Sequence, residues 1–314
     1  MRRITSLPEG ENPVPVVATI GFFDGVHLGH RCLIDQVKEV AARRGMASAV
    51  VTFCQHPRRV MQCSFSPALL TSATEKQELL ETTGIDECIM LDFTPQLALL
   101  SASQFMKQLH DRYGVQALVI GYDHRFGHNR SEGFEDYVRY GAQLGMEVIQ
   151  AQPLTLEGES ATASSSRIRQ LLLQGDVEQA TRLLGYRYFL QGEVESGYQV
   201  GRTIGFPTAN IRVEEEFKLI PAPGVYAVHV TTLDNGKRFG GMLCIGHRPT
   251  LGNGHKLSIE VHLFDYTGNL YHQPLRVEFV RFTRNEQRFN SLEQLRQRIS
   301  LDEKEIRTLL KNNE

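Results

Sequence analysis

The sequence has little of what marks a secreted, metal-bound or membrane protein. Its 314 residues include only five cysteines and no tryptophan. The cysteines are odd in number and form no CxxC pair, which argues against a disulfide framework and against a zinc site. No apolar run approaches the roughly 18 residues of a membrane-spanning helix, and the first residues lack the apolar core of a secretory signal. We therefore expect a cytoplasmic protein without membrane contact.

An excess of charge of one sign is also absent. The formal net charge is −2 and no basic block occurs, so we expect no large nucleic-acid footprint, and any phosphate contacts must be local. Hydrophobic residues at 41% and charged residues at 22% are ordinary for a globular protein. The length allows about two domains, each with a core of its own.

The first half of the chain predicts a doubly wound α/β domain. Between residues 14 and 150, short apolar runs typical of strands alternate with helical segments. Strands are expected at 14–20, 47–53, 88–91, 117–120 and 147–149, and helices before Gly45, before Gly84, over 103–113 and near Tyr137. This alternation implies parallel strands joined by helical crossovers. Sheets of this kind bind ligands beyond the carboxyl ends of their strands.

The second half predicts a small antiparallel β-barrel with a C-terminal helix. Two short helices, 164–174 and 176–184, each end at a glycine. After Gly185 the segments become rich in β-branched and aromatic residues, with strands expected at 186–196, 224–232, 238–246, 257–265 and 275–282. A helix from Ser291 has Leu292, Leu295 and Ile299 on one face, which we expect to pack against the barrel. The domain boundary therefore falls near Gly185, with domains 1–185 and 186–314.

The segment GFFDGVHLGH, Gly21–His30, is the most informative motif of the first domain. It follows the first expected strand and opens the first helix, whose unpaired N–H groups and positive dipole end suit an anion. His27 and His30 can donate hydrogen bonds to a phosphate whose charge grows during attack at the α-phosphorus. The pattern favours nucleotidyl transfer without a covalent enzyme intermediate. Taken alone, however, a glycine turn that merely joins strand to helix gives the same motif.

Three further segments favour the functional interpretation. TFCQHP at 52–57 ends the second strand, GYDHRFG at 121–127 ends a later one, and SSSRIR at 164–169 places hydroxyls and arginines at a helix start. All lie where a doubly wound sheet holds its ligand. Hydroxyls and arginines there suit the β- and γ-phosphates of a nucleotide, which leave as pyrophosphate. Taken singly, the serines are equally good helix caps.

The segment GYQVGRTIGFPTAN, Gly197–Asn210, is the strongest motif of the second domain. Its glycines and Arg202 make a loop suited to wrapping phosphates. Thr208 and Asn210 lie two residues apart, so in an extended strand both side chains face the same way. Two neutral oxygens on one face suit a magnesium ion that keeps most of its waters and bridges nucleotide phosphates. A glycine-rich hairpin with a satisfied polar pair is the alternative.

Glu260 is a carboxylate inside the otherwise apolar strand LSIEVHLF. An acid there is costly unless it is paired or lies at the rim of a pocket. A period of two puts it on the face of Ser258 and His262, opposite the apolar side chains. Either that face is solvated, or Glu260 is a general base for a hydroxyl nucleophile.

At these motifs the first domain resembles the adenylyltransferase module of prokaryotic bifunctional riboflavin kinase/FAD synthetases. That family carries an HxGH motif, a GxDFRFG-like loop and an SSTxIR segment. His124 stands where the family usually has phenylalanine, and Ser166 stands where it has threonine but keeps the hydroxyl. Cys54 and Gln55 replace a common acidic residue and proline.

The resemblance implies a Rossmann-like nucleotidyltransferase domain that converts FMN and ATP to FAD and pyrophosphate. His27 and His30 would be its catalytic residues, and Asp123 and Phe126 would contact the flavin. The residues expected to bind ATP or its phosphates in this domain are Gly21, Phe22, Phe23, Asp24, Gly25, Gly29, Ser164, Ser165, Ser166 and Arg169.

The second domain is similar to the riboflavin kinase half of the same family. PTAN, GVYAV at 224–228, GHRPT at 246–250 and RNEQRF at 284–289 occur in the family order, while Ser196 replaces a common histidine. The resemblance implies ATP-dependent phosphorylation of riboflavin to FMN. On it, Glu260 is the base that acts on the ribityl hydroxyl, and Arg284 lies near the flavin. Thr208 and Asn210 hold Mg²⁺, and Gly201 and Arg202 bind ATP or its phosphates.

The sequence thus predicts a bifunctional enzyme of FAD biosynthesis. Its partners are expected to be small molecules, namely riboflavin, FMN and ATP with Mg²⁺, with FAD as product and no nucleic acid; self-association stays open. One alternative keeps only one of the two activities, although His27, Gly29 and His30 are intact. Another is a flavin-binding regulatory protein on the same scaffold, which would bind flavin without turnover.

Overall fold

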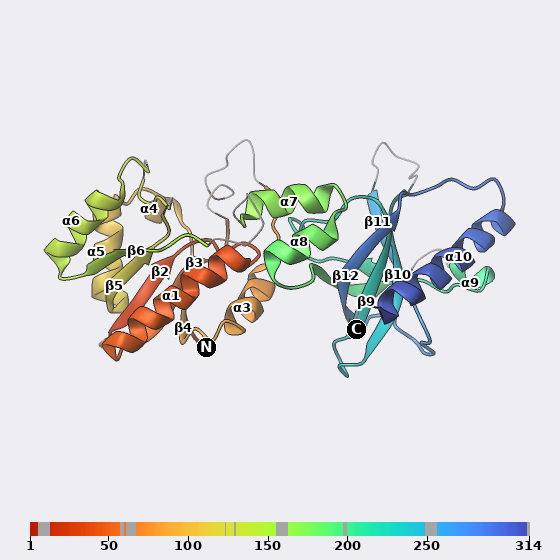
Figure 1. Cartoon of the computed structure of the whole chain (residues 1–314), viewed down its shortest axis with the longest axis horizontal. Helices are drawn as coiled ribbons and strands as arrows, with labels where there is room; N and C mark the ends of the chain where they lie inside the picture. The colour runs from red at the N-terminus through yellow and green to blue at the C-terminus, as the bar shows by residue number, and fades with distance from the viewer. Residues whose placement is uncertain are drawn as a thin grey trace. The chain divides into compact units, whose positions relative to one another are not determined.

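The computed structural model describes residues 1–5, 13–56, 60, 67–122, 124–128, 130–154, 163–196, 200–248 and 256–312. The chain forms two compact units, Met1–Ser165 and Ser166–Glu314 (Figure 1).

The first unit is built on a parallel sheet. Among the described residues, its six strands lie in the order β1-β4-β3-β2-β5-β6. They are β1 (Arg2–Ile4), β2 (Val16–Ile20), β3 (Ala47–Phe53), β4 (Glu87–Leu91), β5 (Val115–Ile120) and β6 (Glu147–Gln150). All residues of β2 and β4 are buried, because parallel sheets are covered on both faces. The predicted doubly wound α/β fold is confirmed.

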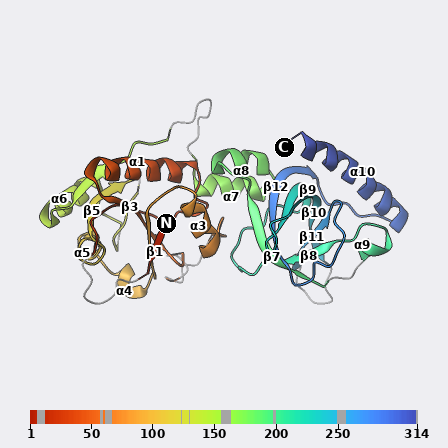
Figure 2. The same ribbon diagram turned by 90° about the horizontal axis from the view of Figure 1, so that it is seen from below.

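The helices of this unit cover both faces of the sheet. They are α1 (Leu28–Arg44), α3 (Ala73–Glu81), α4 (Pro95–Ala98), α5 (Ala102–Tyr113) and α6 (Phe134–Leu144). Helix α1 lies on one face and α5 on the other (Figure 2). The chain first runs from β2 through β3 to β4, and then continues with β5 on the other side of β2. The strand order therefore reverses between β2 and β5, and such a switch point is where these sheets bind ligands.

Two short elements were not predicted from the sequence. Strand β1 has three residues and pairs with β4 at the edge of the sheet, and helix α4 has four residues after its Thr94 cap. Segments this short contain hardly more than one period of either pattern, so periodicity cannot reveal them.

The second unit contains the predicted antiparallel barrel. Its closed strand order is β10-β11-β8-β7-β12-β9. The strands are β7 (Phe189–Glu195), β8 (Ala209–Arg212), β9 (Gly224–Thr232), β10 (Arg238–Arg248), β11 (Lys256–Leu263) and β12 (Pro274–Arg284). Alternate residues such as Leu243, Val261 and Val277 are fully buried, as expected for side chains that fill a small barrel.

Four helices accompany the barrel in the described part of this unit: α7 (Ser165–Leu173), α8 (Val177–Leu184), α9 (Val200–Thr203) and α10 (Leu292–Lys311). Helix α8 packs beside β12, where Arg281 forms an ion pair of 2.6 Å with Glu178. The structural unit thus begins at Ser166, upstream of the change of pattern at Gly185. Because α7 and α8 are helical, their sequence pattern does not reveal that they accompany the barrel.

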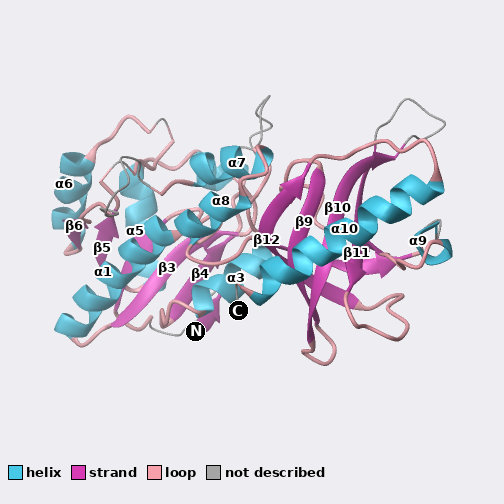
Figure 3. Ribbon diagram, turned by 45° about the vertical axis from the view of Figure 1, so that its right-hand side comes forward, coloured by secondary structure: helices cyan, strands magenta, loops and turns pink. Residues whose placement is uncertain are grey.

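Helix α10 runs across the outer face of the barrel (Figure 3). Its Ile306 and Leu310 join a core cluster with barrel residues that include Val225, Ala227 and Met242, and Ile299 packs against this cluster. The predicted packing of this helix against the barrel is therefore confirmed, but Leu292 at its start is 59% exposed and takes no part in the cluster. In the part of the chain that the structure describes, every helix is too short or too polar to cross a membrane.

Candidate active sites

The glycine-rich motif of the first unit lies at the switch point of the sheet. Gly21 directly follows β2, and Gly121 directly follows β5, which pairs with β2. The two loops therefore leave neighbouring strand ends at the place where doubly wound sheets bind ligands. This arrangement brings two of the predicted nucleotide-site segments together.

The loop between β2 and α1 has an unusual backbone. Phe23 has a φ of 55° and Val26 a φ of 36°, next to Gly25 with a φ of 82°. Positive φ is rare for residues other than glycine, and especially so for a β-branched residue such as valine. Strain of this kind persists only when the surrounding structure holds it, and it is concentrated at functional sites. Phe23 and Val26 are buried, so the packing of their side chains fixes the loop.

Asp24 and Ser165, both expected to bind ATP, form hydrogen bonds with other residues of the protein. The Asp24 carboxylate accepts hydrogen bonds from the backbone N–H groups of Leu70 at 2.9 Å and Thr71 at 3.1 Å. The Ser165 hydroxyl donates to the Asp24 carbonyl at 2.9 Å. In return, Gly25 N–H donates to the Thr71 hydroxyl at 3.2 Å. These contacts fix the loop, whatever further contacts a nucleotide adds.

His27 and His30 stand together at the start of α1. His27 is the N-cap, and its Nδ1 accepts a hydrogen bond from the His30 backbone N–H at 3.3 Å. The neutral His27 ring therefore carries its proton on Nε2, where it can be donated to an anion. The two rings stack with centroids 3.7 Å apart. The structure thus brings both predicted catalytic histidines to one helix N-terminus, a favourable place for phosphate.

His30 is neutral at neutral pH. Burial is the main cause that holds its pKa well below the ordinary value, and repulsion from His27, His124 and Lys76 in their charged forms lowers it further. Its buried Nδ1 has no hydrogen-bond partner among the described residues. A buried polar atom of this kind calls for a ligand or water as partner. His30 is therefore suited to donate or accept a hydrogen bond, and not to act as a resident cation.

Lys76 on α3 was missed by sequence reasoning. Its side chain is buried, and its ammonium donates to the carbonyls of Phe22 at 3.1 Å and Phe53 at 2.7 Å. Burial lowers the pKa of Lys76 to about 8. The available signal was its position three and four residues before the buried Leu79 and Leu80, which puts a charge on the apolar face of a helix.

The remaining predicted residues of this domain occupy different places. The Phe126 ring is buried and stacks on Tyr137 at 4.2 Å. Ser164 and Arg169 are half-buried, and Ser166 is exposed. Ser166 and Arg169 lie on α7, in the second unit. Asp123 lies outside the described residues. The expected roles of these residues stay predictions.

Glu260 belongs to a row of residues that crosses the barrel. It lies opposite Asn210 of β8 on one side and opposite Cys244 of β10 on the other. Cys244 in turn lies opposite Val225 of β9, which pairs with Arg284 of β12. Residues directly opposite each other in a sheet share a face. Since Val225 packs with α10, this is the outer face of the barrel, beneath that helix.

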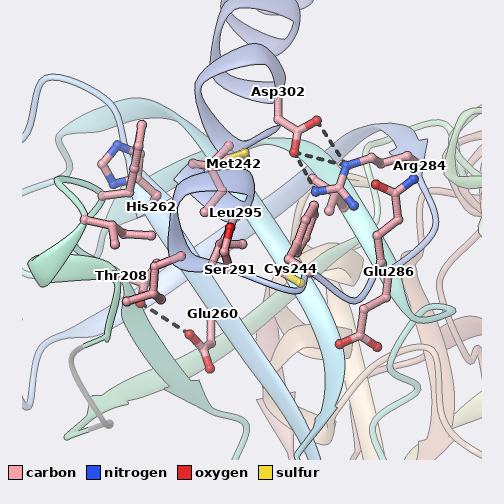
Figure 4. A pocket seen from close by; sticks show the side chains of 18 of the residues that line it. Thr208, Met242, Cys244, Glu260, His262, Arg284, Glu286, Ser291, Leu295 and Asp302 are labelled. Atoms are coloured by element: carbon pink, nitrogen blue, oxygen red, sulfur yellow. Dashed lines mark hydrogen bonds and ion pairs between the residues drawn. The ribbon is translucent and has the colours of Figure 1, made fainter. Parts of the chain in front are cut away.

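A cavity of about 590 Å³ opens on this face. Figure 4 shows its walls: the barrel strands below, α10 above, and the segment after Arg284 at one side. Its size is in the range of small-molecule sites. Its apolar lining includes Val225, Met242, Leu295 and Ile299, and its polar lining includes Thr208, Glu260, Arg284 and Glu286.

Three of the predicted kinase residues lie close together, and two of them, Thr208 and Glu260, line this cavity. The Thr208 hydroxyl donates to Glu260 Oε2 at 3.3 Å (Figure 4), and Asn210 is the direct cross-strand neighbour of Glu260. Glu260 shares its face with Ser258 and His262, as the period of two predicted, and all three are half-buried. Because α10 lies over this face and encloses the cavity with it, the face is not simply solvated, which was the alternative in the sequence analysis.

The guanidinium of Arg284 is held by α10. It donates two hydrogen bonds of 3.0 and 2.6 Å to Asp302 Oδ2, and Arg298 also contacts Asp302 at 2.7 Å. Asp302 is 1% exposed, and both Arg284 and Asp302 line the cavity. The sequence reasoning missed Asp302, although an acid between Ile299 and Ile306 on the apolar face of a helix was a usable signal.

Gly201 and Arg202 lie on α9, next to Thr208. Gly201 lines the large cavity, while Arg202 lines a second cavity of about 280 Å³. Thr208 borders both cavities. This arrangement suits a site in which two ligands meet at Thr208. Residues 197–199 of the predicted loop lie outside the described residues.

Comparisons with known proteins agree with this division into two sites. The FAD synthetase family model matches residues 10–167, and the riboflavin kinase family model matches residues 184–310. A bifunctional riboflavin kinase/FMN adenylyltransferase of Listeria monocytogenes is 36% identical, over 93% of this chain and 91% of that protein. The corresponding protein of Pseudomonas fluorescens is 37% identical, over 93% of this chain and 92% of its own length.

A solved structure shows the same fold over nearly the whole chain. The crystal structure described as a macrolide-efflux protein from Streptococcus pneumoniae is 30% identical, with a TM-score of 0.85, and covers 97% of this chain and 98% of that one. The fold and the two sites define a two-unit transferase of flavin nucleotides. The chain belongs to the family of bifunctional riboflavin kinase/FMN adenylyltransferases.

Proposed function

We propose that riboflavin is phosphorylated to FMN in the cavity at Glu260, and that FMN is adenylylated to FAD at the loop with His27 and His30. The family supplies the two reactions, and the assignment of residues rests on the geometry above. We assign the kinase to residues 186–314 and the adenylyltransferase to residues 1–185. We also propose a cytoplasmic location and partners limited to small molecules; the net charge of −2 without a basic block supports the absence of nucleic acid among them.

In the kinase site, Glu260 is proposed as the general base. The terminal ribityl hydroxyl gives its proton to Glu260 while its oxygen forms a bond to the γ-phosphorus of ATP. The bond from that phosphorus to the β,γ-bridging oxygen breaks, and ADP leaves. The apolar side of the cavity, with Val225, Met242 and Ile299, suits the flavin ring system. The pair of Arg284 with Asp302 fixes the neighbouring wall.

The oxygen atoms near Glu260 also fit a magnesium ion. Thr208 and Asn210 offer a hydroxyl and an amide oxygen beside the Glu260 carboxylate, and Mg²⁺ prefers such hard oxygen ligands together with waters and phosphates. We propose that Thr208 and Asn210 hold Mg²⁺ there, which would neutralise charge on the phosphates of ATP.

In the first unit, the start of α1 is proposed to bind the α-phosphate of ATP. An FMN phosphate oxygen forms a bond to the α-phosphorus, and the bond to the α,β-bridging oxygen breaks, so that pyrophosphate leaves. The charge that develops is stabilised by the Nε2–H of His27, by His30 and by free N–H groups of the helix start. The backbone of Gly21–Gly25 and Gly29 contributes to nucleotide binding.

The cross-strand pair of Glu260 and Asn210, with the Thr208 hydroxyl bonded to Glu260 at a cavity of about 590 Å³, is the observation that supports the kinase proposal best. The direct test is to incubate the purified chain with riboflavin, ATP and Mg²⁺ and to separate the flavins by chromatography. We expect FMN first and FAD later. FMN without FAD would indicate a single retained activity, and bound but unconverted riboflavin would indicate a regulatory flavin-binding protein.

A further inference from the structure

Lys76 links α3 to the ends of two strands. Its ammonium reaches the carbonyl of Phe53, the last residue of β3, and the carbonyl of Phe22 in the loop after β2. It also lies 4.1 Å from the centre of the Phe22 ring. The side chain is 2% exposed. A buried lysine is costly unless its donors are satisfied, and here the two carbonyls bind the ammonium in a fixed place.

The segment that opens α3 holds the same loop at a second point. Thr71 accepts from Gly25 N–H and donates its own backbone N–H to the Asp24 carboxylate. Ser72 then caps α3 in a capping box with Glu75, which fixes the start of the helix. Thr71 and Lys76 therefore hold the loop after and before Phe23, the residue with positive φ.

The loop held in this way leads directly to the proposed catalytic histidines. His27 follows Val26, whose φ is also positive, and the ring of His30 packs against Phe23 with centroids 5.1 Å apart. If the loop relaxed to ordinary backbone angles, the rings and the helix N-terminus would shift with respect to a bound nucleotide. Displacements of about 1 Å can reduce turnover 100-fold without loss of any reacting group.

We propose that Lys76 is a positioning residue for adenylyl transfer, which acts by holding the strained loop 21–27 through the carbonyls of Phe22 and Phe53. The proposal rests on the assignment of that loop to FAD synthesis. Lys76 does not touch the reacting atoms in this scheme. Its charge has a second effect, because it is one of the causes that hold the pKa of His30 low.

The test is Lys76→Met in the full-length chain, which keeps most of the length of the side chain and removes its donors. We expect kcat for FAD synthesis from FMN and ATP to fall about 10- to 100-fold, with a smaller change in KM for ATP. Riboflavin phosphorylation by the same molecules should stay unchanged. Thermal unfolding should occur at a lower temperature, because the buried carbonyls of Phe22 and Phe53 lose a donor, so both activities are measured on the folded protein.

The matched control is Lys107→Met. Lys107 lies in the same unit but is 65% exposed and pairs with Asp111 on the surface, so both activities should be unchanged. Thr71→Val is the second variant. It removes the hydroxyl that accepts from Gly25 N–H at nearly constant volume, and it leaves the Thr71 backbone N–H on Asp24 in place. It should also lower kcat for FAD synthesis while the kinase activity stays unchanged.

His30→Ala, measured in the same series, separates the two levels of the proposal. If His30→Ala loses FAD synthesis but folded Lys76→Met and Thr71→Val keep it, the positioning role of Lys76 is wrong and the site assignment stands. If folded His30→Ala keeps FAD synthesis as well, the site assignment itself is wrong. Should Lys76→Met fail to fold, the Thr71→Val result decides alone. A selective fall in kcat supports the proposal that contacts from Thr71 and Lys76 hold the loop, and parent activity overturns it.

Discussion

The two proposed sites are built in different ways. In the first unit the site is a strained backbone loop with a helix N-terminus, and its polar side chains, such as Asp24 and Lys76, are largely engaged within the protein. In the second unit the site is a row of side chains, including Glu260 and Asn210, on the outer face of a regular barrel. A backbone site needs distant residues to hold it in shape. A site on a barrel receives its geometry from the strand register.

The comparison predicts different responses to substitution. Changes in the kinase site should remove one chemical step and leave the fold intact, because strands β8 and β11 hold their positions without the side chains of the site. Changes around the adenylyltransferase loop should act through geometry as well as through lost contacts.

Glu260→Gln should have the largest effect on activity. Loss of a general base costs roughly 10²- to 10⁴-fold, so FMN formation from riboflavin should fall by that factor, while FAD formation from added FMN persists. Steady-state assays of both reactions on the same preparation provide the measurement. Kinase turnover near that of the parent would exclude Glu260 as the base.

His30→Ala should lower FAD synthesis by about 10²- to 10³-fold, the range for loss of one preorganised donor. Riboflavin phosphorylation should be unaffected, and KM for ATP should change less than kcat, because the interaction is strongest in the transition state. If His30 only packs the turn, the variant will instead melt at a lower temperature, and its folded fraction will adenylylate FMN at the parent rate.

His229 on β9 predicts a loss of stability in acid. Burial, together with Arg238 and Arg187, lowers its pKa from 6.5 to about 4, and its buried Nε2 has no hydrogen-bond partner among the residues described. The unfolded chain therefore takes up a proton as pH falls below 6.5, and stability is lost until pH reaches about 4. His229→Phe should remove roughly 2 kcal/mol of this loss.

Urea unfolding of the parent and of His229→Phe at about pH 7.5 and about pH 4.5 measures this effect. The change in the free energy of unfolding between the two pH values is compared for the two proteins. At the higher pH the buried ring is neutral in both states, so that point serves as the reference. An equal loss of stability in both proteins between the two pH values would assign the acid sensitivity to other groups.

The smallest expected effect concerns the boundary between the units. Fragments 166–314 and 184–314 should both phosphorylate riboflavin, but the longer one should be more stable by about 2 kcal/mol. Helices α7 and α8 supply the reason: Leu172 accepts a hydrogen bond from Ala222 at 3.0 Å, and Glu178 pairs with Arg281 at 2.6 Å. Equal urea midpoints for the two fragments would count against a structural contribution of these helices to the kinase domain.

Much of the fold follows from local sequence patterns. The alternation of strands and helices predicted the doubly wound sheet, and the predicted strand 47–53 coincides with β3. Helix α1 ends before Gly45, which adopts the left-handed conformation expected of a helix-terminating glycine. The period of two in LSIEVHLF placed Glu260 on the correct face. These features depend on residues close together along the chain, so composition and spacing are sufficient to reveal them.

The sequence by itself also determined the position of each motif at a strand end or a helix start. Through the resemblance of these motifs it also indicated the family. The tertiary structure alone decided which side chains hold these motifs. Lys76 reaches Phe22 across 54 positions, and Thr208 meets Glu260 across 52. Contacts of this kind depend on strand register, barrel closure and the packing of helices on sheets. Spacing along the chain does not encode these distances, because they arise only when separate elements bury their apolar faces together.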